Sequence, residues 1–231
     1  MPSLTNTPRL PASEAIETIS IRFLSPALFK TEFQTSNKPV ILNDVLNEDT
    51  LHWARSNADM QLPSASIDVC LNKISVHTGL RRKRTIDWQL LTTSLGHQEH
   101  LKLSVQDETI IQFRGKSRIL LFPPTVTHNL YSIKKWHDVP TAHISQAEIE
   151  STHVEKFQKF KAALLEAQIL HLEAGQTLYI PVGWWTQVQA AAPSRAYAIH
   201  CTWKVGSLWH YCVCPQAAYL CSLLGFLRLI R

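Results

Sequence analysis

Apolar residues in the second half of the chain recur in short runs that are typical of β-strands. Two such runs flank a polar turn at residues 114–117, and two more flank a turn at 173–176. Runs of β-branched and aromatic residues favour strands, and a Gly-containing polar turn between two runs favours a hairpin. The pattern predicts hairpins over 109–122 and 169–181, followed by a strand over 196–203.

The first 95 residues mix helix and strand signals. Serines precede acidic or proline-containing segments at Ser13 and Ser25, and serine is a preferred residue just before a helix. The expected helices begin at Ser13 and lie over 25–29, 50–58 and 85–91, and the expected strands lie over 38–42 and 66–76.

A helical front followed by antiparallel strands indicates an α+β fold with a small barrel or jelly roll. We divide the chain into a helical and strand section over 1–95, a barrel over 96–206 and an apolar tail over 207–231. Hydrophobic residues make up 45% of the chain and charged residues 18%, which excludes a disordered protein.

The charge balance does not indicate a nucleic-acid partner. The 23 basic and 18 acidic residues give a formal net charge of +5, and four of the basic residues form one run at 81–84. Such a run is typical of a solvated loop. The N-terminus lacks the apolar core of a secretory signal, and the five cysteines have no zinc-finger spacing. We therefore expect an intracellular protein, cytoplasmic or nuclear.

Two segments, 105–124 and 172–188, carry a family resemblance. Together they resemble the cupin-like JmjC hydroxylases, among them the asparaginyl hydroxylases of hypoxia-inducible factor and the wybutosine-synthesising tRNA hydroxylases. The resemblance extends over about residues 101–205. It implies a double-stranded β-helix that holds iron(II) and 2-oxoglutarate at one mouth. Only residues 78–100 are available for the family's first barrel strand, so we expect either an incomplete barrel or an unidentified segment in place of that strand.

The resemblance also implies where the iron ligands would fall. The family uses an H-x-D pair and a later His that follows two aromatic residues; here the aligned positions hold Lys102, Ser104 and Thr186. The family's lysine for 2-oxoglutarate falls on Ser117. We assign Trp203 to the same degenerate pocket.

Nearby histidines offer few replacements for these ligands. His200 lies out of phase with Trp203 in a strand, and we therefore leave it out of the pocket. His97 and Glu99 form an H-x-E that could supply relocated ligands, but we favour a solvated loop for this segment. Lys102 could mark a residual anion pocket or extend to the barrel mouth.

The residues at the aligned ligand positions favour a pseudoenzyme that has no iron, no 2-oxoglutarate and no catalytic residues. Such a protein would act by binding a protein or small molecule or by dimerisation. The alternative is an iron- and 2-oxoglutarate-dependent hydroxylase that acts on a protein, RNA or small metabolite through relocated ligands.

The tail holds an apolar stretch over 216–230, which is shorter than the roughly 20 residues of a membrane-spanning helix. We favour a homodimer formed through this stretch over membrane association.

Overall fold

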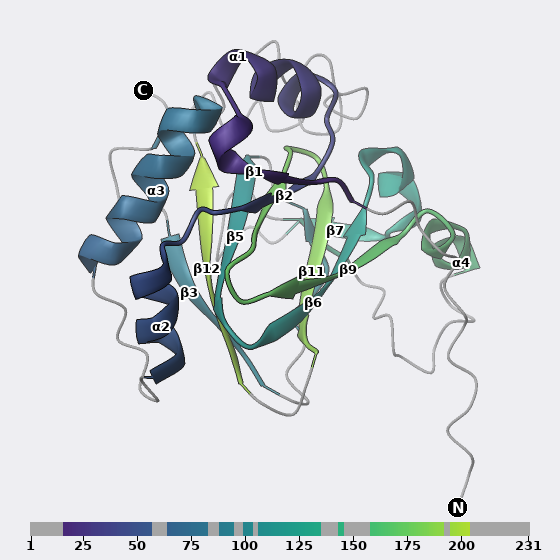
Figure 1. The fold of residues 1–231 in the computed structure, drawn as a ribbon. Coiled ribbons are helices and arrows are strands. Elements are labelled where there is room, and N and C mark those ends of the chain that lie inside the picture. Colours follow the sequence, from purple (N-terminus) through teal and green to yellow (C-terminus); the bar gives the residue numbers. More distant parts are fainter. Residues whose placement is uncertain are drawn as a thin grey trace, which may run out of the picture.

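The strands of the computed structural model form two sheets that face each other (Figure 1). Each sheet has six strands within the described part of the chain. The structure describes residues 16–56, 64–82, 88–94, 99–103, 106–134, 143–145, 158–191 and 195–203.

The first sheet has the strand order β1-β2-β10-β5-β12-β3. Its strands are β1 (Thr18–Ser20), β2 (Val40–Asn43), β10 (Thr177–Ile180), β5 (Asp107–Arg114), β12 (Ala196–Trp203) and β3 (Trp88–Thr93). Strands β1 and β2 pair in parallel, and the other neighbours pair antiparallel.

The second sheet has the order β7-β8-β4-β11-β6-β9, and its neighbours are all antiparallel. Its strands are β7 (Ser132–Lys134), β8 (His143–Ser145), β4 (Lys102–Leu103), β11 (Trp185–Ala190), β6 (Lys116–Phe122) and β9 (Gln168–Glu173). The predicted α+β jelly roll with a helical N-terminal section is confirmed, and the sheets do not close into a barrel.

Helices cover the outer face of the first sheet, as Figure 1 shows. They are η1 (Ile21–Phe23), α1 (Pro26–Phe29), the π-helix η2 (Lys30–Thr35), α2 (Glu48–Ser56) and α3 (Ser64–Thr78). On the second sheet, η3 (Pro124–Asn129) and α4 (Gln158–Leu164) cover part of the outer face. No helix in the described part of the chain is long and apolar enough to cross a membrane.

Successive residues of a strand point to opposite faces of its sheet, and this divides the buried core into three layers. Ile110 and Ile119, one from each sheet, belong to the cluster between the sheets. The neighbouring Ile111 packs under the N-terminal helices, and Leu120 packs against the α4 side. A two-residue period therefore assigns each strand residue to the space between the sheets, which we call the interior, or to an outer face.

The two predicted hairpins are sharp corners between the sheets. Strands β5 and β6 meet at Gly115 but pair with different partners, and so do β9 and β10 at Gly175. A Cβ on Gly115, whose φ is 71°, would lie 2.9 Å from the Cα of Ala196. The strand predictions are confirmed, but the hairpin pairing is wrong, because each corner sends its second strand into the opposite sheet.

Several N-terminal predictions are confirmed. The side chain of Ser25 accepts a hydrogen bond from the Leu28 amide at the start of α1. Strand β2 and helix α2 lie where the sequence places them.

Three N-terminal predictions are wrong. The strand expected over 66–76 is helix α3, whose buried Ile67, Cys70, Leu71, Ile74 and Thr78 follow a helical spacing. The sequence predicts a helix that begins at Ser13, but residues 18–20 form strand β1. It also predicts a helix over 85–91, but residues 88–91 belong to strand β3.

Candidate functional site

Two of the aligned iron-ligand positions face each other across neighbouring strands. Lys102 on β4 is directly opposite Thr186 on β11. Thr186 also pairs with Leu121 of the between-sheet cluster, so both positions face the interior. The adjacent pair, Leu103 and Trp185, packs on the α4 side. The register therefore brings together Lys102 and Thr186 at one end of the sandwich.

The Lys102 ammonium has an ion-pair partner within the chain. Its Nζ lies 3.2 Å from Glu99 Oε2, and the two side chains are 32% and 25% exposed. Glu99 is held beside β11, because its carbonyl accepts a hydrogen bond of 2.8 Å from Gln187 Nε2 and its amide donates to the Val188 carbonyl at 3.3 Å. The anion that a half-buried lysine needs is thus Glu99 itself.

A second pair of ionisable side chains, which sequence reasoning missed, lies in the interior of the first sheet. His200 Nε2 lies 2.9 Å from Glu108 Oε2, and the side chains are 13% and 5% exposed. Glu108 precedes the interior residue Ile110 by two positions on β5, and His200 follows the interior Ala198 by two positions on β12. Only residues 103–106 separate Lys102 from the start of β5, which places this pair at the same end of the sandwich as Lys102.

His200 and Trp203 point to opposite faces of β12, as the sequence predicts. The sequence analysis assigned Trp203 to the pocket and left His200 out, and the structure shows the reverse orientation. Trp203 packs in the cluster under the N-terminal helices, and its Nε1 donates a 3.0 Å hydrogen bond to Thr109 Oγ1. His200 faces the interior. The sequence shows that the two side chains point to opposite faces, but only the strand register shows which of them faces the interior.

Ser117 lies in the interior at the other end of the sandwich. It pairs with Ala190 on β11, four residues beyond Thr186, which is about 13 Å along a strand. The structure therefore does not bring Ser117 together with Lys102 and Thr186. Ser104 and His97 lie outside the described residues.

A buried carboxylate anchors the N-terminal helices to the loop before β11. Asp107 accepts hydrogen bonds from Gln34 Nε2 at 2.8 Å and from the Val182 amide at 3.0 Å, and it is fully buried. Burial raises the pKa of Tyr179 well above its usual range, and the charge of Asp107 raises it further. These contacts position the chain that leads into Trp185 and Thr186.

Comparison with known families agrees with this architecture. A family model described as a cupin-like domain matches residues 89–204. The chain belongs to the cupin-like family. The match begins within β3, so this strand belongs to the family domain. Strand β3 lies in the stretch over 78–100 that the sequence leaves for a first barrel strand.

The residues at the mouth of this cupin-like domain do not fit an iron ion. A protonated lysine has no lone pair to donate, and a neutral threonine hydroxyl is a poor ligand for iron(II). Two described carboxylates lie at this end, and both have a partner: Glu99 pairs with Lys102, and Glu108 lies 2.9 Å from His200. Among the described residues, no group of three or more His, Cys, Asp and Glu side chains could hold a metal ion.

Proposed function

We propose that this chain is a metal-free member of the cupin-like family, related to the JmjC-type 2-oxoglutarate dioxygenases, which acts by binding and not by iron-dependent oxidation. The observation that carries the proposal is the ion pair of Lys102 with Glu99 opposite Thr186. An ammonium group stands at the position where the related hydroxylases need a neutral imidazole.

Electrostatics support this proposal. A divalent cation beside Lys102 would be repelled by the ammonium group, and Glu99 could approach the metal only by leaving its lysine partner. At the mouth, Glu99 balances the charge of the Lys102 ammonium group, and Glu108 lies beside the His200 imidazole. Such a surface suits a polar ligand or partner more than a bare metal ion.

Binding could also involve a second copy of the chain. The apolar stretch over 216–230 supports a homodimer on sequence grounds, and it lies outside the described residues. A protein or small molecule is the other class of partner that we propose.

Anaerobic titration of the full-length protein with iron(II) and 2-oxoglutarate tests the proposal. We expect no metal-to-ligand charge-transfer band and no succinate after oxygen is admitted. A stoichiometric band would refute the metal-free function and favour a hydroxylase with relocated ligands. Loss of that band in a His97→Ala or Glu99→Gln variant would identify these residues as the ligands.

A further inference from the structure

Four of the six large apolar side chains that the described part of the chain exposes lie on its N-terminal helices. They are Phe23 on η1, Leu28 on α1, and Val69 and Val76 on α3, and their exposed fractions run from 43% to 77%. Monomeric proteins rarely leave large apolar surfaces uncovered, so a group of such residues indicates a contact surface.

Three of these residues, Phe23, Val69 and Val76, form one strip, which we call the α3 patch. Val69 and Val76 are seven residues apart, which is about two turns, and they therefore share a face of α3. Helix η1 adjoins the C-terminal end of this face, because His77 Nδ1 lies 3.3 Å from the Leu24 carbonyl oxygen. Phe23 and Val76 directly precede these two residues, so they extend the strip across both helices.

Helix formation alone does not explain the valines of the α3 patch. Valine is a weaker helix former than the straight-chain polar residues that suit exposed helix positions. The patch also has a charged border, where Arg82 pairs with Asp68 of α3 at 2.9 Å. An apolar strip with a polar border is typical of a protein contact surface.

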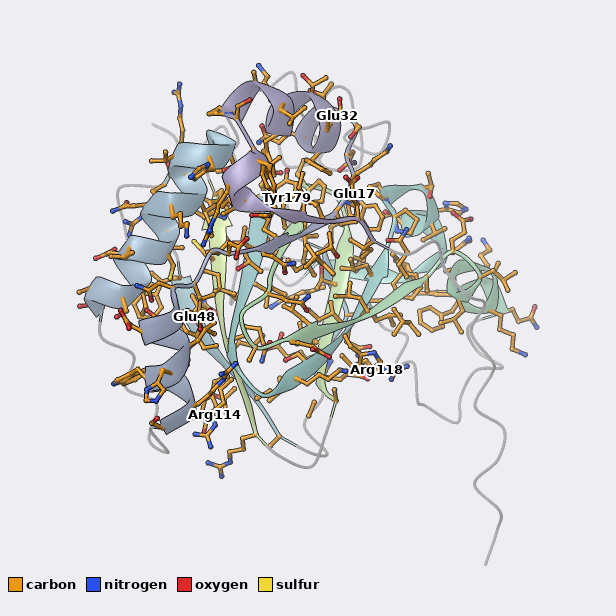
Figure 2. The ribbon with its side chains drawn as sticks, viewed as in Figure 1. Glu17, Glu32, Glu48, Arg114, Arg118 and Tyr179 are labelled. Atoms are coloured by element: carbon orange, nitrogen blue, oxygen red, sulfur yellow. The ribbon has the colours of Figure 1, made fainter. Side chains whose placement is uncertain are left out.

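The helices that carry the α3 patch are fixed to the first sheet and to each other. The ring of Phe29 on α1 contacts that of Tyr179 on β10, with centroids 4.8 Å apart, and Figure 2 shows Tyr179 beneath the N-terminal helices. Gly79, directly after α3, lies so close to α1 that a Cβ on it would be 3.1 Å from the Pro26 Cβ. The patch is therefore preformed, which lowers the entropy cost of covering it.

The chain leaves β12 in the same layer as α3. Trp203, the last residue of β12, belongs to the buried cluster that contains Ile67 and Cys70 of α3, and Figure 1 shows this end of β12 beside α3. The strand partner of Trp203 is Asp107, which accepts a hydrogen bond from Gln34 of η2. The last described strand therefore ends under the N-terminal helices.

The apolar stretch over 216–230 is close enough along the chain to reach the α3 patch. Twelve residues, 204–215, separate it from Trp203, and they can span up to about 40 Å when extended. The 15 residues of α3 extend over only about 22 Å. A segment tethered at this distance meets the patch of its own copy at a high effective concentration.

We propose that residues 216–230 pack on the α3 patch of their own chain and cover Phe23, Val69 and Val76. Eleven of the 15 residues of the stretch are apolar, which is more than three exposed side chains can cover. Part of the stretch therefore remains for the second copy in the proposed homodimer. This inference rests on that proposed homodimer and names the surface on which the apolar stretch lies.

Thiol cross-linking in the full-length protein tests the contact. Cys221 lies in the apolar stretch, and serine replaces the two other cysteines of the tail, at 212 and 214. In this background, a short bismaleimide should join Cys221 within one chain to the thiol introduced by Val69→Cys or Val76→Cys. Leu165→Cys is the matched control and should form no such link, because Leu165 is as exposed as Val76, at 69%, and follows α4. Links only between chains would assign the patch to a second copy, and either this result or the absence of links would overturn the inference.

Hydrogen–deuterium exchange of residues 216–230 gives a second readout. In the full-length protein, we expect Val76→Lys to raise the exchange rate of these amides about tenfold, because one buried valine contact is lost. Leu165→Lys should leave the rate unchanged. Lysine suits the C-terminal end of a helix, so α3 should stay folded in the variant. Equal exchange rates in Val76→Lys and the wild type would overturn the inference.

Failure of this inference can be told apart from failure of the proposed function. A dimer that dissociates when residues 216–231 are deleted, but that shows no link to α3, keeps the homodimer and overturns the contact with the α3 patch. Iron binding in the titration refutes the metal-free function and leaves a cross-linked contact with α3 standing.

Discussion

Lys102 and Thr186 are directly opposite each other in the antiparallel pair of β4 and β11, and both face the interior. Opposed residues in such a pair have Cβ atoms about 4.5–5.5 Å apart. That separation lets two imidazoles reach one metal ion. The register therefore brings the two positions close together, although a lysine and a threonine occupy them.

Replacing the side chains should therefore restore a metal site. We expect Lys102→His with Thr186→His to bind cobalt(II), and the addition of Ser104→Asp to tighten the binding, because ligand type and spacing define such sites. Visible absorption of bound cobalt(II) and calorimetry measure the affinity. The two single histidine variants are the controls. A folded triple variant with no gain over them would show that the pocket geometry is not retained.

The Lys102/Glu99 pair should contribute little to stability but should be coupled. Because both side chains are partly exposed, we expect a coupling energy of about 0.5–1 kcal/mol from a double-mutant cycle with Lys102→Met and Glu99→Gln. Urea denaturation of the four proteins measures it. The more exposed pair of Lys116 with Glu173 is the comparison and should give a smaller coupling. Strictly additive effects of the two mutations would contradict the pairing.

Cys70 should make the protein less stable at alkaline pH. Burial raises the pKa of its thiol from 9.0 to about 11. The unfolded chain loses this proton first, so the contribution is complete below about pH 9 and is lost as the pH rises toward 11. Between about pH 8 and about pH 10, the wild type should lose about 1 kcal/mol more unfolding free energy than Cys70→Val. Equal losses in the two proteins would contradict the buried thiol.

Deleting residues 216–231 tests the prediction of self-association. We expect the full chain to be a dimer and the shortened chain a monomer in light scattering, because an apolar stretch of this kind needs a covering surface. Unchanged mass together with loss of liposome binding would favour membrane association.

The sequence predicted the strands of the jelly roll better than their pairing. Residues 109–113 and 118–122 have strand composition, and both lie in strands. A tight turn at Gly115 is compatible with a hairpin or with a corner between sheets, and only long-range packing decides between them. Helix α3 was missed because its buried residues, spaced from Ile67 to Thr78, lie among enough β-branched residues to resemble a strand.

The candidate site was predictable only where a motif fixes the register. The alignment singled out Lys102 and Thr186, and the strand register puts these two residues opposite each other. The pair of Glu108 with His200 joins residues far apart in the sequence, and no local pattern reveals such a contact. Which face His200 presents depends on the packing of the N-terminal helices, which cover the side of Trp203.

The metal content of the full-length protein, purified in the presence of iron(II), tests the central claim most directly. Because an ammonium and a hydroxyl stand at two of the positions that the resemblance aligns with iron ligands, we expect far less than one iron per chain after removal of loosely bound metal. One tightly bound iron per chain, retained through dialysis, would contradict the metal-free function.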